Sequence, residues 1–394
     1  MKKRFFAILL CIPFLTGCWD KRELNEIAIV VAMGIDENPN TKELILTTQV
    51  VRPEAMRKNG NGSNKLPVEI VSSTGKTVFS AKQNIMKKFD RKPTFAHCKI
   101  VVISESLAEK GIQSILDYLV RSNEVRPLIW IGITKGASPK EVLSVNNGIS
   151  TIQARYLSYT IKLQSENSET RFSYLQEFIE DLLHNGVAPK TGVMEVEEIF
   201  PSSSGNSGSS NDKEIKLTET AVFKKDRLLG YLTNEETLGL NWISGNIKRS
   251  TLNVPSLNEK GKVIATRVVK GKRSIKLEKK DDEYIFNIEI NAMSELKDQQ
   301  DYYDTSDPEI LSLVEKEQSK LIEHEVKMVM EKMKNELKLD IAGLNKIVER
   351  KYPEEWKEIK DDWENVLPRV RYNVKVDSKI VRTGLLLEPM KIKE

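Results

Sequence analysis

The sequence predicts an α/β fold of the mixed α+β type, with more than one sheet-bearing unit. Three observations support this prediction. Apolar runs of strand length alternate with segments of helical periodicity over residues 27–200, further strand-like runs and one long amphipathic segment occupy residues 214–394, and a stretch rich in Ser and Gly separates the two at 201–213. Alternating strands and helices favour a mixed or parallel sheet that helices cover.

The N-terminus has the three parts of a secretory signal. Three basic residues precede an apolar run of about ten residues, and residues 15–18 read Leu-Thr-Gly-Cys. With a rise of about 1.5 Å per residue, a helix of this length falls well short of a hydrocarbon core of about 30 Å. The run therefore directs export rather than spanning the membrane, and we expect residues 1–17 to be a cleaved signal peptide.

Cys18 is the predicted site of lipid attachment. Residues 15–18 resemble the bacterial lipobox, whose cysteine carries a diacylglyceryl group on its sulfur and an acyl group such as palmitate on its amino group. Two acyl chains hold a protein stably at a membrane, whereas one chain does so only reversibly. Residues 18–26 are then a tether on the outer face of a bacterial cytoplasmic membrane. The alternative is an ordinary cleaved signal in which Cys18 is incidental.

The charge balance excludes a dedicated nucleic-acid surface. The chain has 61 Lys and Arg against 57 Asp and Glu, and removal of the three basic residues of the signal leaves 58 against 57. A nucleic-acid interface needs basic residues concentrated on one face. Because Cys11 leaves with the signal and Cys18 is acylated, Cys98 is the only free thiol and no intrachain disulfide is possible.

Residues 27–200 predict an N-terminal α/β region. A loop rich in Gly, Asn and Ser occupies residues 57–64. The predicted strands cover residues 27–33, 44–51, 67–71, 100–103 and 128–133, and the predicted helices cover residues 77–89, 104–119, 149–163 and 172–183.

The stretch at 201–213 is the predicted linker to a C-terminal region. Ser, Gly and Asn occupy nearly every position there and cannot pack in a core. A long hairpin loop inside one domain is the alternative, because strand-like residues 193–199 and 215–223 flank the stretch. Residues 214–394 then form one C-terminal region, or two that cover 214–300 and 301–394.

The C-terminal region combines β runs with one long helix. Ser306 and Glu309 have the spacing of a capping box, and Pro308 lies in the first turn of the helix. An apolar stripe along this helix predicts packing on its own sheet, with a coiled-coil partner as the alternative. The stripe consists of Ile322, Val326, Val329, Met333 and Leu337. The remaining predicted elements are strands at 228–232 and 370–381, a helix at 235–243, and three β runs within 263–293 that Gly271 and residues 279–282 separate.

No motif in the chain predicts an enzyme. Gly75, Lys76 and Thr77 imitate the end of a phosphate-binding loop, but position 70, where that motif needs glycine, is Ile70. Acidic clusters at 195–198, 281–283 and 361–362 lie among lysines without the glycine-punctuated spacing of a calcium loop, and predict solvated surface.

We also expect structural roles for the histidines and for the free cysteine. His97, His184 and His324 are far apart in the sequence and lack the short spacing of a metal site. Cys98 follows His97 directly, and adjacent strand residues point to opposite faces, so a small buried thiol is favoured over a thiol–base pair. We therefore expect no catalytic residue, no metal and no cofactor.

The tryptophans leave alternatives open. We expect four of them to pack in cores, with stacking on a ligand as the alternative: Trp130, Trp242, Trp356 and Trp363. Trp19, which follows the acylated cysteine, is placed as readily in the lipid interface as in a protein contact.

Several separated blocks of the sequence resemble the Ger(x)C family, the lipoprotein C subunits of spore germinant receptors. The first is Gly-Cys-Trp-Asp at 17–20, followed by Arg-Glu-Leu at 22–24 and Gly-Ile-Asp at 34–36. Further blocks at 99–126, 220–239 and 340–384 follow in the order of the family, including Tyr352-Pro353, Trp356, Trp363 and Thr383-Gly384. Residues 151–192 carry little of the resemblance.

The resemblance implies a role and a location. It implies three mixed α/β domains in an extended row, and a subunit that works with an integral A subunit and a transporter-like B subunit in the inner membrane of a spore, where nutrients trigger germination. Assembly or signal transmission without catalysis is the expected function, and direct capture of a nutrient by this lipoprotein is the alternative. Only Cys18 is carried over as a functional residue. The sequence names neither the nutrient nor the surface that faces the A and B subunits.

Overall fold

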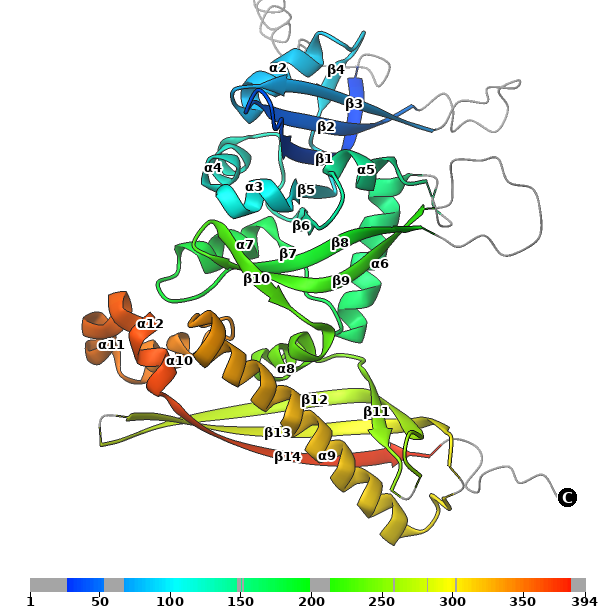
Figure 1. Cartoon of the computed structure of the whole chain (residues 1–394), viewed down its shortest axis with the longest axis vertical. Helices are drawn as coiled ribbons and strands as arrows, with labels where there is room; N and C mark the ends of the chain where they lie inside the picture. The colour runs from blue at the N-terminus through cyan, green and yellow to red at the C-terminus, as the bar shows by residue number, and fades with distance from the viewer. Residues whose placement is uncertain are drawn as a thin grey trace, which may run out of the picture.

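The structure is a computed structural model that describes residues 27–52, 67–146, 150, 152–198, 213–257, 259–281, 283–301 and 303–383. The predicted signal peptide, Cys18, the tether 18–26 and the loop 57–64 lie outside the described residues. The described elements form an elongated molecule in which a ten-stranded sheet and a four-stranded sheet follow each other along the long axis (Figure 1). The two sheets with their helices confirm the mixed α+β class.

The first sheet has parallel strands at its centre and antiparallel strands at both ends. Its order is β10-β9-β8-β6-β5-β1-β2-β3, with β4 beside β1 and β7 beside β6. Neighbours among β1, β5, β6 and β8 are parallel, whereas the outer pairs are antiparallel. The strands are β1 Ile27–Glu37, β2 Leu44–Val51, β3 Val68–Gly75, β4 Lys92–Thr94, β5 Ile100–Ser104, β6 Trp130–Thr134, β7 Ser173–Tyr174, β8 Lys190–Glu198, β9 Lys213–Lys224 and β10 Arg227–Leu232.

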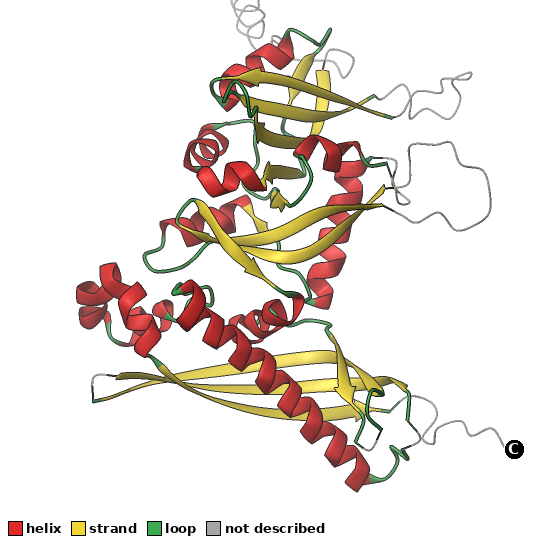
Figure 2. Ribbon diagram, viewed as in Figure 1, coloured by secondary structure: helices red, strands yellow, loops and turns green. Residues whose placement is uncertain are grey.

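Helices cover both faces of this sheet (Figure 2). Along β5, Val101 and Ile103 enter one core, and Ile100 and Val102 enter the core on the opposite face. Every residue of β5 is buried, as expected for a parallel strand covered on both sides. The helices are α2 Val78–Met86, α3 Glu105–Lys110, α4 Gln113–Arg121, α5 Pro139–Ser144, α6 Gln153–Asn167 and α7 Leu175–Leu183.

The predicted helix at 104–119 is two helices in the structure. Gly111 follows α3 with a φ of 118°, which a residue with a side chain rarely adopts, and the chain turns there before α4 begins. Glycine therefore ends the first helix, and the predicted continuous helix is wrong at this point.

The strands on either side of the predicted linker pair with each other. β8 and β9 run antiparallel from Lys190 opposite Val222 to Glu198 opposite Lys213. The stretch at 201–213 therefore connects two neighbouring strands of one sheet, which is the hairpin alternative, and it does not separate the two sheets. Ser and Gly prevent packing in a core, but they do not distinguish a linker from a hairpin connection. The remaining domain limits stay predictions.

The second sheet has the order β11-β12-β13-β14. The three β runs predicted within 263–293 are two long strands, because β12 continues through Gly271, which pairs with Ala292. A Cβ on Gly271 would lie 2.9 Å from the Trp242 ring, so this glycine makes room for the indole instead of breaking the strand. The strands are β11 Thr251–Pro255, β12 Val263–Lys280, β13 Glu283–Gln299 and β14 Arg371–Arg382.

The long helix α9 packs on this sheet, which confirms the predicted role of its apolar stripe. Ile322, Val326 and Val329 share one core with Ile288 and Ile290 of β13. The capping residue is Asp307 rather than Ser306, since the Asp307 carboxylate accepts the N–H of Glu309. The helices are α8 Asn234–Ser244, α9 Pro308–Glu331, the π-helix η3 Lys332–Leu337, α10 Asn345–Lys351, α11 Pro353–Ile359, α12 Trp363–Val366, and the 3₁₀ turns η4 Lys360–Asp362 and η5 Leu367–Arg369.

Helix α8 connects the two sheets. It begins two residues after β10 ends and packs against α9 at Gly239, where an added Cβ would lie 2.1 Å from the carbonyl oxygen of Glu325. No side chain fits against backbone at that distance. Glycine at this position therefore sets how closely α8 approaches α9.

We predict that Gly239→Ala lowers the free energy of unfolding by about 2–4 kcal/mol, because backbone must move to admit the methyl group. Urea denaturation of wild type and variant measures the difference. Gly230→Ala is the control, since a Cβ there meets only Leu337 at 3.9 Å. An equal effect of the two substitutions would contradict the close approach of α8 to α9.

Candidate functional site

Cys98 is a buried free thiol. It precedes β5 in a turn, not in a strand as assumed, and its thiol donates to the carbonyl oxygen of Ile100 at 3.3 Å. Burial raises the pKa of the thiol to about 12, so the sulfur stays protonated near neutral pH. His97 is exposed. The small buried thiol is confirmed, although the strand geometry given as its reason is wrong.

Neither the other two histidines nor the Gly-Lys-Thr segment has surroundings that suggest catalysis or phosphate binding. His184 Nε2 lies 3.1 Å from Glu349 Oε2, and His324 is exposed on α9. Thr77 is the N-cap of α2, where its hydroxyl accepts the N–H of Ser80. In the part of the chain that the structure describes, no group of three His, Cys, Asp or Glu side chains could hold a metal ion.

All four tryptophans of the described chain are buried, as core packing requires. Trp130 stacks on Tyr174 with ring centroids 3.9 Å apart, and Trp356 meets Trp363 edge to face at 5.6 Å. The indole N–H of Trp242 donates to Glu325 at 3.0 Å. Trp130 also lines a pocket, so its indole adjoins a cavity in the part of the chain that the structure describes.

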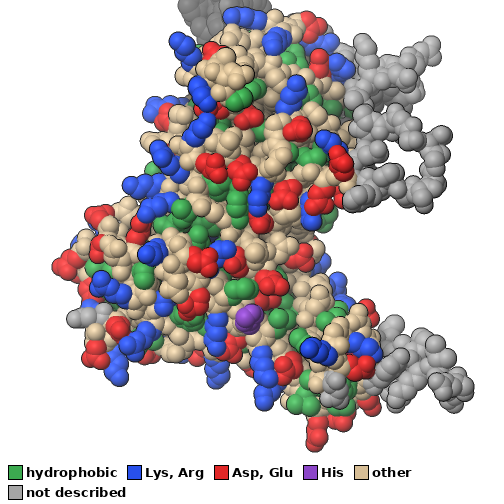
Figure 3. All heavy atoms as spheres, in the orientation of Figure 1, with side chains coloured by type: hydrophobic (Ala, Val, Ile, Leu, Met, Phe, Trp, Pro, Cys, Tyr) green, Lys and Arg blue, Asp and Glu red, His purple; other side chains and the backbone are tan. Residues whose placement is uncertain are grey.

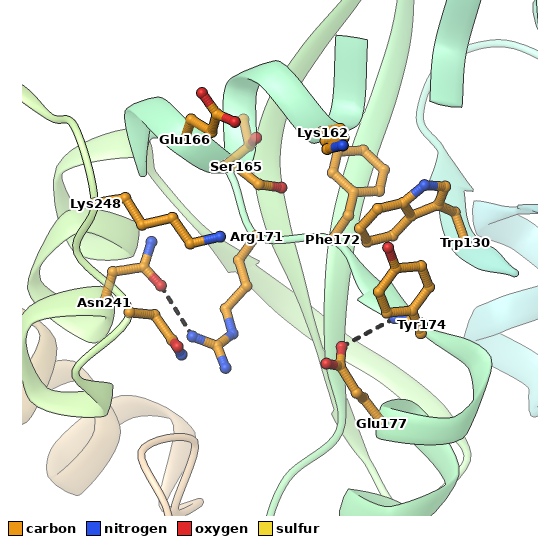
Figure 4. A pocket seen from close by; sticks show the side chains of 12 residues that line it. Trp130, Lys162, Ser165, Glu166, Arg171, Phe172, Tyr174, Glu177, Asn241 and Lys248 are labelled. Atoms are coloured by element: carbon orange, nitrogen blue, oxygen red, sulfur yellow. Dashed lines mark hydrogen bonds between the residues drawn. The ribbon is translucent and has the colours of Figure 1, made fainter. Parts of the chain in front are cut away.

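This pocket lies at the junction of the two sheet-bearing units (Figure 4). Its volume is about 280 Å³, and its walls come from α6 and β7 on one side and from α8 and residues 246–248 on the other. It is the candidate functional site because cavities between structural units commonly hold ligands. Its polar groups come from segments far apart in the sequence.

The end of α6 shapes the pocket. Ser168 ends the helix with a φ of 63°, in the left-handed region. Its carbonyl oxygen accepts the side-chain N–H of Asn241 at 2.8 Å, and its hydroxyl accepts the backbone N–H of Lys248 at 3.2 Å. The backbone N–H of Arg249 donates to the Glu166 carbonyl at 2.7 Å. These bonds hold the two walls together.

Arg171 lies at the centre of the pocket. Its Nη1 donates to the side-chain oxygen of Asn241 at 2.9 Å. With its amide oxygen turned toward Arg171, Asn246 accepts from Nη1 and Nη2 at 2.5 and 3.0 Å. Burial lowers the pKa of Arg171, with the charges of Asp181 and Glu177 acting in the opposite direction, and a guanidinium remains charged at neutral pH.

The remaining walls are aromatic or polar. Phe172 and the stacked pair Trp130 and Tyr174 form one side of the pocket (Figure 4). Glu177 accepts the backbone N–H of Tyr174 at 3.0 Å and so caps α7. The hydroxyl of Thr170 is buried in the wall and has no hydrogen-bond partner. The pocket thus combines an apolar side with one buried hydroxyl that has no hydrogen-bond partner.

A second junction joins the first sheet to the helices after α9. Asp340 is buried, and its carboxylate accepts the backbone N–H groups of Gly343 and Asn345, both at 2.7 Å. Its carbonyl oxygen accepts the N–H of Ala188, just before β8. Such a carboxylate, bonded to backbone donors, fixes a turn without offering free charge to a ligand.

Charged side chains are interspersed over the visible face of the molecule (Figure 3). Acidic and basic residues alternate there rather than gathering by sign, in agreement with the near-neutral balance. Within the described ranges, no helix combines the length and the apolar character needed to cross a membrane.

Comparison with known proteins identifies the family. The family model described as "Spore germination protein N-terminal domain" matches residues 20–196, and the one described as "Spore germination B3/ GerAC like, C-terminal" matches residues 218–384. Together they cover most of the chain, in the expected order. The chain belongs to the Ger(x)C family.

Ger(x)C relatives match along their whole length. Spore germination protein KC of Bacillus subtilis (strain 168) is 28% identical over 394 residues, which cover 98% of this chain and 96% of the relative. Spore germination protein B3 of the same organism is 23% identical over 408 residues, with 97% and 98% covered. The crystal structure of the GerBC protein has the same fold, with a TM-score of 0.53, 18% identity, and coverage of 89% of this chain and 96% of that one.

Sequence reasoning did not find the pocket. Arg171, Asn241 and Lys248 form no motif, and Arg171 lies in the stretch with the least family resemblance. Only the fold brings the end of α6 to α8. Among the residues that line the pocket, the sequence suggested a ligand contact only for Trp130. Its position beside the pocket agrees with core packing and with a ligand contact alike.

We predict that Glu325 makes stability depend on pH. Burial raises the pKa of its carboxyl to about 7, aided by the charge of Glu235 and opposed by the hydrogen bond from Trp242. The folded state therefore binds the proton more tightly than the unfolded state. The stability that protonation contributes is complete below about pH 4.5 and is lost as the pH rises through about 7.

Glu325→Gln should remove this dependence and raise the free energy of unfolding at pH 8 by about 2 kcal/mol, since the neutral amide can still accept from Trp242. Urea denaturation at about pH 6 and at about pH 8, roughly one unit to either side of 7, measures the effect. Glu323→Gln, on the same helix beside Lys327, is the control. A wild-type pH slope in Glu325→Gln would contradict the assignment.

Proposed function

We propose that this chain is the lipid-anchored C subunit of a spore germinant receptor, required for nutrient-triggered germination. The observation that carries the proposal is the pair of family models that together span residues 20–384 apart from 197–217. The relatives that match over at least 93% of their length are named as spore germination proteins. Full-length agreement supports a shared role more strongly than a match to one domain.

The proposed role is assembly or signal transmission rather than catalysis. Cys98 is buried with a raised pKa, His97 is exposed and does not serve it as a base, and the described residues hold no metal-binding cluster. The proposed partners are an integral A subunit and a transporter-like B subunit. Two adjoining α/β units joined by α8 provide a large surface for such contacts.

The proposed location is the outer face of the cytoplasmic membrane, which is the inner membrane of the spore. Its support is the tripartite sequence of residues 1–17 and the cysteine that follows. Acylation of Cys18 would anchor the chain without a membrane-spanning helix, because two acyl chains suffice for stable attachment. Trp19 would then lie either at the level of the lipid headgroups or against a protein partner.

Deletion of the gene should abolish or slow germination with at least one nutrient, measured as the loss of optical density of a spore suspension. Restoring the intact gene should recover the wild-type rate. The strain should lack other receptors of the same family, so that redundancy does not hide the defect. Normal germination with every nutrient in that strain, alone and in mixtures, would contradict the proposed function.

Cys18→Ala should release the protein from membranes or block removal of the signal, because the anchor and the processing site are both lost. Membrane fractionation followed by immunoblotting measures this. Cys98→Ala is the matched control, since Cys98 is buried and takes no part in anchoring. Full membrane attachment and normal germination of Cys18→Ala would show that partner contacts, not lipid, hold the protein in place.

A further inference from the structure

The charge of Arg171 is only partly offset, because Asp181 and Glu177 act on it without forming an ion pair with it. Its hydrogen-bond acceptors are the neutral amides of Asn241 and Asn246. Among the described ion pairs, none places a carboxylate within 4.0 Å of its guanidinium. Withdrawal of an unpaired charge from water is costly, so a group of this kind is stabilised by an anionic partner.

Two further cations line the same pocket. Lys162 of α6 and Lys248 contribute to its walls, and no carboxylate in the described part of the chain lies within the 4.0 Å of an ion pair from either ammonium group. Figure 4 shows the Lys248 ammonium directed toward Arg171. Cations gathered around one space repel each other, and an anion between them removes that repulsion.

Neither acidic residue of the pocket forms an ion pair with these cations in the described part of the chain, although the charge of Glu177 acts on Arg171. Glu177 accepts the backbone N–H of Tyr174, and its carboxylate therefore belongs to the start of α7. The Glu166 carboxylate points away from Arg171 (Figure 4). The three basic lining residues outnumber these two, so the pocket keeps a positive charge.

The pocket also offers an apolar surface and a free hydroxyl. Trp130, Phe172 and Tyr174 form an aromatic side, and the buried Thr170 hydroxyl lacks a partner. A volume of about 280 Å³ is close to the lower limit for small-molecule sites, about 300 Å³. Its size and lining suit an acid with a compact apolar or aromatic body.

We propose that the pocket between α6 and α8 binds a small organic acid, whose carboxylate pairs with Arg171 and Lys248 and whose apolar body lies against Trp130. A guanidinium binds a carboxylate through two parallel hydrogen bonds, which gives both strength and orientation. Because Arg171 belongs to the first sheet-bearing unit and Lys248 follows α8, the bound acid connects the two units. The inference does not depend on the germination role.

Binding is tested with the full chain in detergent, by titration with phenylacetate, L-phenylalanine and succinate while Trp fluorescence is recorded. Phenylacetamide, L-phenylalaninamide and succinamide are the matched probes, in which amides replace the carboxylates. We expect saturable binding of at least one acid with a Kd on the order of 1 mM or lower, and at least tenfold weaker binding of its amide. No saturable binding of any acid, or equal binding of acid and amide, would overturn the proposal.

Substitutions in the pocket test whether the acid binds there. Arg171→Gln should weaken binding of the acid at least tenfold, and Lys248→Gln should weaken it while leaving the thermal unfolding midpoint unchanged, because the Lys248 side chain has no ion pair to lose. Lys276→Gln, at an exposed position of β12 in the second sheet, is the control and should bind as wild type. If Arg171→Gln does not fold, Lys248→Gln decides. Wild-type affinity in Lys248→Gln, or in a folded Arg171→Gln, would overturn the proposal.

Discussion

The packing of α8 against α9 is the contact on which the rest of the structure depends. Gly239 brings the two helix backbones together at a distance that admits no side chain. From that contact, Trp242 extends into the core of the second sheet and meets Glu325. Val222 and Leu232 of the first sheet belong to the same core as Phe286 of the second, so one continuous apolar core crosses the junction.

This shared core holds the two sheet-bearing units together. Unpacking the two units would expose the shared core, which costs about 25 cal/mol for each Å² of apolar surface. The Asp340 turn adds a second attachment, because its carbonyl binds Ala188 while its carboxylate fixes the following turn. Two units attached at two points can pass a displacement from one to the other.

The same contact creates the pocket. Asn241 lies on α8 one residue before Trp242, and its amide binds both the Ser168 carbonyl and the Arg171 guanidinium. The position of Arg171 therefore follows from the docking of α8. Ser168 accepts a left-handed conformation there, a strain that the surrounding hydrogen bonds offset. A ligand held by Arg171 and Lys248 would be sensitive to the docking of the two units, and would stabilise it in return.

The sequence predicted most strands and helices, because periodicity reports which face of an element is buried. The apolar run at 100–103 and the stripe from Ile322 to Met333 were assigned correctly for that reason. Glycine was harder to interpret, because Gly111 ends a helix whereas Gly271 lies inside a long strand beside Trp242. The pairing of β8 with β9 and the site around Arg171 depend on contacts between distant segments, which composition and spacing do not encode.

The rigid connection of the two units is tested most directly by a distance measured between them. Spin labels at Lys140 of α5 and Lys375 of β14, both exposed, can be introduced as cysteines in a background in which Cys11, Cys18 and Cys98 are alanine, and measured by pulsed electron paramagnetic resonance. Fixed docking of α8 on α9 predicts a single narrow distance distribution. A broad distribution, or two separate distances, would show that the units move independently and would contradict the account.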